Sequence, residues 1–294
     1  MISSETIETI LNISIQEPFT CKTLGLLNEK KDQMLSFIDC DHFIYHVNHH
    51  PSLKAVFTLD TFLDQVTSEV VCIPHPEPRY AYYLLREAIE KSALQFFPSQ
   101  IHDSVDISER ASVSETSVII EEGVIIEDHV VIHPNVHIGK HCIIQSGSVI
   151  GQNGFEYIET SKGLHQVQHY GKTILNDNVS IGSNTCIDSG TMDKETIIGS
   201  GTKVGNNVQV SFGALLGNWN MISHQVSIGS HVSTGKHVHI HPLCRIENNS
   251  HIGHDSYIYS GSVVSSNIPS CSSVSMKLHH TLSKNKLHKK YISS

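Results

Sequence analysis

Histidine and cysteine are the side chains of this sequence with the most direct chemistry, since imidazole moves protons near neutral pH and both groups bind metals. The 294-residue chain contains 22 histidines and seven cysteines. The cysteines are scattered, without the Cys-x-x-Cys pairs typical of zinc sites, and we interpret them as reduced thiols. We find no His-x-x-x-His pair beside an acidic residue on a predicted helix. We therefore expect no metal and no bound cofactor.

Charge is distributed unevenly along the chain. The formal net charge of −9 at pH 7 argues against a nucleic-acid-binding protein, because contacts to phosphates need a basic surface. After Pro269 the sequence contains no acidic residue but five lysines, which are Lys277, Lys284, Lys286, Lys289 and Lys290. This basic tail could attract an acidic protein or the phosphates of coenzyme A, or it could be only a solvated chain end.

The elements that must position these side chains follow a period of six residues. From Ile198 to Val264 an aliphatic residue recurs at every sixth position, and Thr234 is the one exception in this column. Four residues after each member comes a second column of mostly small or β-branched residues, from Thr202 to Ser262. Gly also recurs directly after many members of the aliphatic column.

A period of six fits neither the 3.6 residues of a helical turn nor the two-residue alternation of a strand. It predicts a chain that turns a corner every six residues, with both columns pointing inward. Three short strands then form one coil of about 18 residues, and coils stack at about 4.8 Å in a parallel β-helix. We expect the recurring glycines and the asparagines to occupy corners that need a positive φ.

The hexads divide the chain into three parts. We expect a β-helix of about eight coils over residues 100–268, and a basic tail over 269–294. The period is absent from 151–172, which predicts a loop or hairpin that projects from the β-helix, a place where function is often located. The period also changes phase through SGTMDKET at 189–196.

Residues 1–99 lack the hexad and predict a small α/β domain. We expect strands at 34–38, 55–59 and 70–73, and an amphipathic helix at 78–94 with Pro78 in its first turn. This domain could bind a ligand, or it could only cap an open end of the β-helix. Two rings after the first strand, Phe37 and Phe43, could bracket a planar base or belong to the core.

The [Leu/Ile/Val]-Gly-x-x-x-x hexads resemble those of the hexapeptide-repeat acyltransferases, which implies left-handed coils. Two segments, IHPNVHIGKHCIIQSGSVIGQNGFEYI at 132–158 and ILNDNVSIGSNTCIDSGTMDKETIIGSGTKVGNNVQV at 174–210, resemble the UDP-3-O-acylglucosamine N-acyltransferases of lipid A synthesis. PRYAYYLL at 78–85 is similar to the same family. The resemblance implies a homotrimer with active sites between subunits, a nucleotide-linked amino-sugar acceptor, and a phosphopantetheine thioester donor on acyl carrier protein or coenzyme A.

Acyl transfer from a thioester needs a base, and imidazole suits this task. In the family the base is a histidine two residues after an aliphatic hexad position. A straight alignment places Phe212 there, and a phenyl ring cannot accept a proton. Twelve residues later ISHQVSIG at 222–229 matches the motif, so the resemblance implies His224 as the catalytic residue. One coil beyond it, where the family takes an oxyanion donor from the backbone, lies Pro242, which has no N–H.

The resemblance also implies binding residues, which are Phe37, Phe43, Asn153, Phe155 and Asp188 for the acceptor and Lys277 and Lys284 for the donor. The family's nucleotide motif, Phe-x-x-Asn-x-x-Tyr, is changed here, because Cys40 stands where the family has Asn. Specificity for a uridine nucleotide is therefore open.

We interpret the chain as a cytoplasmic, homotrimeric acyltransferase without a membrane-spanning segment. It would move an acyl group from a thioester to the amine of a nucleotide-linked amino sugar. Two alternatives remain. ISHQVSIG also resembles the acetyl-CoA-dependent N- or O-acetyltransferases of surface-polysaccharide sugars, and Phe212 fits a protein that binds a sugar nucleotide or acyl carrier protein without catalysis.

Overall fold

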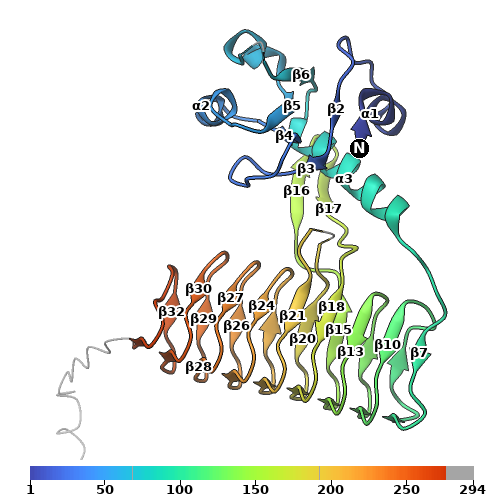
Figure 1. Ribbon diagram of the computed structural model, residues 1–294, viewed down its shortest axis with the longest axis vertical. Helices are drawn as coiled ribbons and strands as arrows, with labels where there is room; N and C mark the ends of the chain where they lie inside the picture. The colour runs from blue at the N-terminus through green and yellow to red at the C-terminus, as the bar shows by residue number, and fades with distance from the viewer. Residues whose placement is uncertain (68, 192, 276–294) are drawn as a thin grey trace, which may run out of the picture.

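The computed structural model describes residues 1–67, 69–191 and 193–275. Strands from β7 to β33, apart from β16 and β17, wind into a left-handed parallel β-helix, and a small α/β unit precedes them in the chain. Figure 1 shows this unit standing on one side of the β-helix, connected to its middle by the hairpin of β16 and β17. The predicted fold class is therefore confirmed. Lys277 and Lys284 of the predicted tail lie outside the described residues.

Three parallel sheets form the faces of the β-helix. The first contains β7 (Gln100–Ile101), β10 (Val118–Ile120), β13 (Val136–Ile138), β18 (Thr173–Leu175), β21 (Thr196–Ile198), β24 (Leu215–Leu216), β27 (Ser233–Thr234) and β30 (His251–Ile252). The second contains β8 (Asp106–Ile107), β11 (Ile125–Ile126), β14 (Ile143–Ile144), β19 (Ser180–Ile181), β22 (Lys203–Val204), β25 (Met221–Ile222), β28 (His239–Ile240), β31 (Tyr257–Ile258) and β33 (Ser273–Val274). The third contains β9 (Ser112–Val113), β12 (Val131–Ile132), β15 (Val149–Gln152), β20 (Cys186–Asp188), β23 (Gln209–Val210), β26 (Ser227–Ile228), β29 (Arg245–Ile246) and β32 (Val263–Val264).

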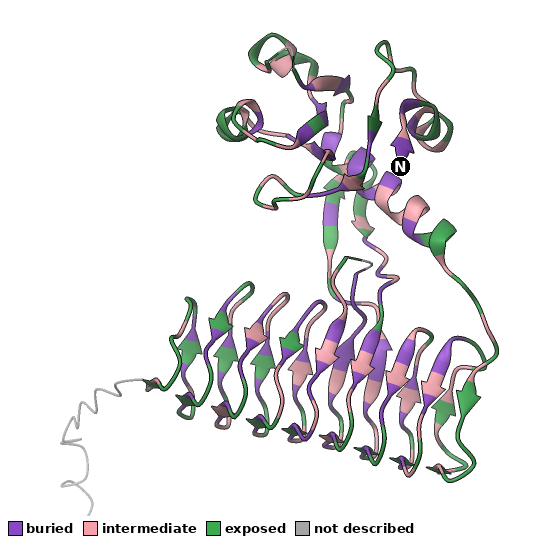
Figure 2. Cartoon of the chain, in the orientation of Figure 1, coloured by how far each residue is buried: buried purple, intermediate pink, exposed green. Residues whose placement is uncertain are grey.

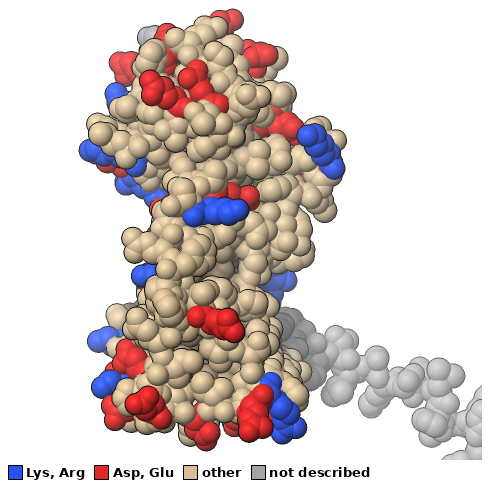
Figure 3. Space-filling view, turned by 90° about the vertical axis from the view of Figure 1, so that its right-hand side faces the viewer, with Lys and Arg blue, Asp and Glu red and all other residues tan. Residues whose placement is uncertain are grey.

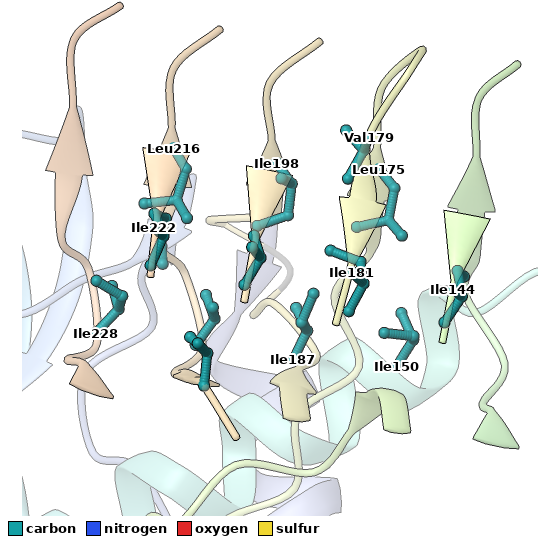
Figure 4. Close-up of a cluster of buried hydrophobic side chains, with 14 of the residues drawn as sticks. Ile144, Ile150, Leu175, Val179, Ile181, Ile187, Ile198, Leu216, Ile222 and Ile228 are labelled. Carbon is teal, nitrogen blue, oxygen red and sulfur yellow. The ribbon is translucent and has the colours of Figure 1, made fainter. Parts of the chain in front are cut away.

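The core of the β-helix is the pair of columns that the hexads predict. Every member of the aliphatic column from Ile198 to Val264 is buried. Figure 2 shows buried residues recurring along successive coils, and Figure 4 shows Ile198, Leu216, Ile222 and Ile228 of this column among the buried side chains. Thr234, its one polar member, is buried as well, because its hydroxyl accepts hydrogen bonds from the Gly217 N–H and from Nδ2 of the buried Asn220. The break in the column is therefore a satisfied polar pair inside an apolar core.

The recurring glycines have a different role from the predicted one. At Gly199 and Gly205 the backbone φ is not positive, and an added Cβ would lie 2.5 to 2.8 Å from backbone atoms of the next coil. These glycines therefore allow close stacking of coils. The positive φ occurs two residues later, at corners occupied by residues such as Asn207 and His231. The prediction was right for several asparagines and wrong for these glycines.

The N-terminal unit is built around a four-stranded parallel sheet, in the order β3 (Thr23–Leu24), β4 (Met34–Phe37), β5 (Leu53–Thr58) and β6 (Val71–Pro74). The three predicted strands and the predicted helix, α3 (Pro78–Ala93), are confirmed with shifts of one or two residues at their ends. The remaining elements were not predicted. They are β3 of this sheet together with β1 (Ile2–Ser3), α1 (Ser4–Leu11), β2 (Thr20–Cys21), η1 (Asp41–Phe43), α2 (Ile44–Asn48) and η2 (Asp60–Gln65).

Two interruptions of the hexads connect the β-helix with the N-terminal unit. The first contains the antiparallel hairpin of β16 (Tyr157–Thr160) and β17 (Gly163–Gln166), in agreement with the predicted excursion. The second is the short turn between Thr191 and Lys194.

Among the described residues, no helix combines the length and apolar character needed to cross a membrane.

Candidate active site

A cavity of about 220 Å³ lies where the N-terminal unit, the hairpin and the β-helix meet. We call it the junction cavity. Its walls include Tyr83 and Arg86 from α3, Glu156 from the base of the hairpin, Lys194 from the second interruption, and Phe212 and His231 from corners of the β-helix. Both interruptions of the hexads and the PRYAYYLL segment therefore meet at one place.

Ion pairs and hydrogen bonds hold the N-terminal unit in this position. Lys31 pairs with Asp193 at 2.8 Å, and Glu29 pairs with Lys194 at 3.3 Å. On α3, Glu87 Oε1 accepts a hydrogen bond from the ring of His165 on β17 at 3.0 Å. These contacts come from both interruptions, so they fix the N-terminal unit over the cavity and the β-helix.

Figure 3 shows basic side chains as isolated groups between acidic ones on one face of the molecule.

A chain of hydrogen bonds starts at Tyr83 and Glu156 in the wall of the junction cavity. Tyr83 donates from its hydroxyl to Glu156 Oε1 at 3.1 Å, and His169 Nε2 donates to Glu156 Oε2 at 2.8 Å. The Gly154 N–H donates to His169 Nδ1 at 3.3 Å, so both nitrogens of this fully buried ring are occupied. Burial raises the pKa of Glu156, but the hydrogen bond from His169 and the charge of Arg86 hold that pKa below its usual value. Glu156 is thus a carboxylate with two fixed partners.

Phe212 packs in the middle of this arrangement. Its ring lies 4.4 Å from the His169 ring and 5.3 Å from the His231 ring, centroid to centroid. A Cβ at Gly154 would lie 2.7 Å from the Phe212 ring, which explains the glycine in the Asn153-Gly154-Phe155 segment. Phe212, which the resemblance places at the family's base position, therefore lines the junction cavity with an apolar ring.

His231 is the corner residue one coil beyond Gly213. Its φ is 57°, and its Nδ1 lies over Gly213, where an added Cβ would come within 2.3 Å. Nδ1 is buried without a hydrogen-bond partner, and the ring makes no side-chain hydrogen bond within the described part of the chain. Burial, and next the positive charge of Lys194, lower the pKa of His231 to about 4. The imidazole is therefore neutral at pH 7.

A buried ion pair lies behind the cavity on α3. Arg86 Nε donates to Glu90 Oε1 at 2.7 Å across one helical turn, and both side chains are largely buried. Burial raises the pKa of Glu90 in spite of the Arg86 charge, and its Oε2 has no partner among the described residues. Arg86 remains charged, so it contributes a fixed positive charge to the cavity wall.

His224 lies elsewhere, on an exposed corner after β25 in the second sheet. Its Nδ1 accepts a hydrogen bond from the Asn206 N–H at 2.8 Å. Asn218 and Asn248 occupy the same position in their hexads, and their Oδ1 atoms accept equivalent backbone N–H groups at 3.1 and 2.9 Å. His224 therefore supports the stacking of coils as an asparagine does elsewhere. Because Nδ1 is an acceptor, the neutral ring carries its proton on Nε2.

His224 also borders a groove of about 270 Å³ on the second sheet, together with Met221, His239 and His241. The groove is separate from the junction cavity and shares no lining residue with it. The predicted catalytic histidine and the family's base position thus belong to different surfaces of the β-helix.

The other residues predicted to bind the acceptor are near the hairpin base but do not line the junction cavity. Asn153 joins the two ends of the hairpin, because its Oδ1 accepts the His169 N–H at 2.7 Å and its Nδ2 donates to the Val167 carbonyl at 3.0 Å. Phe155 is 88% exposed and contacts Tyr157. Asp188 is buried and accepts hydrogen bonds from two glutamine side chains, and its burial raises its pKa. Their assignment as binding residues stays a prediction.

The two predicted stacking rings are in different environments. Phe37 is half-buried, packs against Tyr82 and Tyr83 with centroids 5.2 and 6.3 Å away, and has the Arg79 guanidinium over its face. Phe43 is 43% exposed and contacts His46. Within the described residues, the two rings do not contact each other. This geometry favours the core interpretation for Phe37.

A possible metal-ligand group was missed in the sequence. Cys40, Asp41 and His42 place their ligand atoms within 4.8 Å of one another. His42 and His46, four residues apart in the sequence and beside Asp41, lie in helical turns over Asp41–Asn48, where no helix was predicted. The Asp41 and His42 side chains are 73% and 87% exposed, so the group lies open to water.

Sequence reasoning did not single out Tyr83, Glu156, His169, Lys194 or His231. Glu156 and His169 are inside the predicted excursion, so their general location carried a signal. His231 follows the hexad as an ordinary corner residue among 22 histidines. Only the position of the N-terminal unit over that corner distinguishes it.

Comparison with known proteins confirms the resemblance inferred from the hexads. A family model described as bacterial transferase hexapeptide, with six repeats, matches residues 117–152. The chain is 43% identical over 89 residues to UDP-3-O-acylglucosamine N-acyltransferase of Rhizobium rhizogenes, which covers 30% of this chain and 25% of that protein. It is 45% identical over 92 residues to the protein of the same name from Rhizobium meliloti, covering 31% and 26%. The matches thus span about a quarter of the length of these relatives.

Among solved structures, the fold is similar to that of a UDP-N-acetylglucosamine acyltransferase from Bacteroides fragilis. The sequence identity is 22%, the TM-score is 0.47, and the match covers 58% of this chain and 67% of that one.

Proposed function

We propose that this protein is an N-acyltransferase that moves an acyl group from a phosphopantetheine thioester to the amine of a nucleotide-linked glucosamine. The observation that carries the proposal is the 43% identity over 89 residues to a UDP-3-O-acylglucosamine N-acyltransferase. The acceptor class is that of the named relatives. A cytoplasmic location, predicted from the sequence, belongs to the same proposal.

The junction cavity supports this proposal. It contains the position of the family's base, and its walls combine aromatic rings with the charged groups Arg86, Glu156 and Lys194. Such a mixture suits a ligand that has both a polar sugar and an apolar acyl chain. The reaction needs no metal or redox group, because the thioester is already activated toward attack by an amine.

The donor side of the proposal rests on the sequence. Acyl carrier protein is acidic and coenzyme A carries phosphates, so the lysine-rich segment after Pro269 would attract either one. We propose acyl carrier protein or coenzyme A as the carrier of the donor acyl group, with Lys277 and Lys284 as contact residues.

We also propose a homotrimer. Outward aliphatic side chains of the first sheet support it, since Ile119, Ile174 and Ile197 are only half-buried and Leu215 is 43% exposed. A row of this kind is suited to packing against another copy. Light scattering coupled to size-exclusion chromatography would give the mass of three chains, and a monomer at micromolar concentration would contradict the proposal.

A product assay tests the function. The protein is incubated with acylated acyl carrier protein and UDP-3-O-acylglucosamine, and mass spectrometry follows the amide product. UDP-N-acetylglucosamine is the control acceptor, because its nitrogen is already acylated. Product with the amine acceptor alone supports N-acyl transfer.

The alternative functions give different results in the same assay. Product with acetyl-CoA in place of the longer acyl donor would support an acetyltransferase. Phe212 favours a second candidate, a protein that binds the nucleotide sugar without turnover. That candidate predicts saturable binding by calorimetry and no amide with any donor.

A further inference from the structure

The family's base position is occupied by Phe212, so the proposed reaction needs another proton acceptor in the junction cavity. Three imidazoles are candidates for this proton acceptor because of their positions in the sequence and the fold. They belong to His169, His224 and His231. A base must present a ring nitrogen with a free lone pair to the acceptor amine. Hydrogen bonding decides among the three.

Two of these rings have their acceptor nitrogen occupied. His169 is fully buried, its Nδ1 accepts the Gly154 N–H and its Nε2 donates to Glu156. His224 uses Nδ1 to accept the Asn206 N–H, so its neutral ring presents a protonated Nε2. His224 also lies on a corner that does not line the cavity.

His231 differs in both respects. It lines the junction cavity beside Phe212, and within the described residues its ring makes no side-chain hydrogen bond. Nδ1 is buried over Gly213, which leaves Nε2 as the nitrogen available to a ligand in the cavity. We propose that His231 is the proton acceptor of this acyltransferase and replaces the missing histidine at position 212. This inference rests on the proposed function.

The step balances with these groups alone. The acceptor amine forms a C–N bond with the thioester carbonyl carbon, and its nitrogen gives a proton to His231 Nε2. The tetrahedral intermediate then breaks its C–S bond, and the imidazolium gives the same proton to the leaving thiolate. The products are an amide and a free thiol. A weakly basic imidazole suits the second half of this step, because its conjugate acid gives up the proton readily.

Charged groups around His231 influence how readily its ring takes up a proton. The charged groups of the cavity wall are Glu29, Glu156 and Asp193 on the acidic side and Arg86 and Lys194 on the basic side. Burial and Lys194 keep the ring neutral, whereas Glu156 and Glu29 act in the opposite direction. A neutral ring at pH 7 is ready to accept a proton from the first intermediate.

The test variant is His231→Asn, which suits the corner, since Asn207 and Asn249 occupy equivalent corners with positive φ. The matched control is His141→Asn. His141 is also a corner residue with its Nδ1 over a glycine, Gly123, but it is exposed and remote from the cavity lining. Both variants remove one imidazole from the same backbone geometry.

The experiment measures kcat and KM for amide formation from acylated acyl carrier protein and UDP-3-O-acylglucosamine across pH. We expect His231→Asn to lower kcat by about 10²- to 10⁴-fold with a smaller change in KM. The acid limb of the wild-type pH profile should be lost, and added imidazole should restore part of the rate. His141→Asn should match the wild type in all of these measurements.

The outcomes separate the inference from the proposed function. Wild-type protein without any amide product would contradict the function itself. An active wild type with an equally active His231→Asn variant would overturn the role of His231 and leave the function standing. A variant with low kcat, an unchanged pH profile and no rescue by imidazole would also overturn it, because that pattern indicates a packing role.

Discussion

The ring of Phe212 stands perpendicular to the imidazole of His231, with an interplanar angle of 88° and centroids 5.3 Å apart. The two residues belong to successive coils, so a ring that cannot accept a proton lies directly beside one that can. This relationship places an imidazole in the cavity beside position 212, which carries no proton acceptor. The Phe212 ring also packs between His169 and His231.

The first prediction concerns restoration of the family residue by Phe212→His. We expect no gain in kcat and a lower melting temperature, because the smaller polar ring loses contacts with Gly154 and His169. Steady-state kinetics and thermal unfolding of the variant and the wild type check this. A gain of about tenfold or more in kcat would mean that position 212 still sets the chemistry.

His224 provides the second prediction. In His224→Asn the amide oxygen can accept the Asn206 N–H, as Asn218 does for Ser200, so stability and kcat should stay close to wild type. In His224→Ala the acceptor is lost, and the free energy of unfolding should fall by about 1 kcal/mol. Denaturant unfolding and kinetics of the two variants give the answer. A 10²-fold or larger loss of kcat in His224→Asn would show instead that His224 is the base, as predicted from the sequence.

Glu156 links the hairpin to α3, and its charge gives the third prediction. Its folded-state pKa is depressed, so its contribution to stability is present above the unfolded pKa of about 4.3 and is lost as the pH falls through the folded value. Glu156→Gln should therefore lower the melting temperature at pH 7 and have less effect near pH 3. Glu159→Gln, an exposed change three residues further on in β16, is the control. An equal effect of both variants at pH 7 would contradict the role of this carboxylate.

The fourth prediction follows from the depressed pKa of His231. Above an unfolded pKa of about 6.5 the ring is neutral in both states, and below it the unfolded chain takes up a proton first. The contribution of neutral His231 to the free energy of unfolding is thus lost as the pH falls from about 6.5 to about 4, the folded-state pKa. His231→Asn should unfold with a shallower pH dependence in this window than the wild type or His141→Asn. Parallel curves of unfolding free energy against pH for the three proteins would contradict a depressed pKa of His231.

The β-helix could be predicted from the sequence because its geometry forces one inward side chain at each sixth position. Ile222 and Ile228 are inward for this reason alone, and even Thr234 stays in register through its bond to Asn220. The recurring glycines were misassigned because the hexad does not show how closely the next coil approaches. Contact between coils is a property of the stack and is absent from any single repeat.

The candidate site could be predicted only in part. The excursion at 151–172 located the region that contains Glu156 and His169 without identifying either residue. The resemblance placed Phe212, which cannot accept a proton, at the family's base position. His231 could not be identified, because the hexad places all corner histidines in equivalent positions. What distinguishes it is the N-terminal unit, which is anchored by pairs such as Lys31 with Asp193, residues far apart in the sequence.

The most direct test of the account fills the junction cavity and measures amide formation. Ser230 lines the cavity beside His231, so Ser230→Trp introduces a bulky ring into the proposed acceptor site. Ser265→Trp, at an exposed position near the end of the β-helix, is the control. With acylated acyl carrier protein and UDP-3-O-acylglucosamine, the account predicts amide formation by the wild type and the control, and at least a 10²-fold lower rate for Ser230→Trp, about 2.7 kcal/mol in activation free energy. Wild-type rates in a folded Ser230→Trp variant would contradict it.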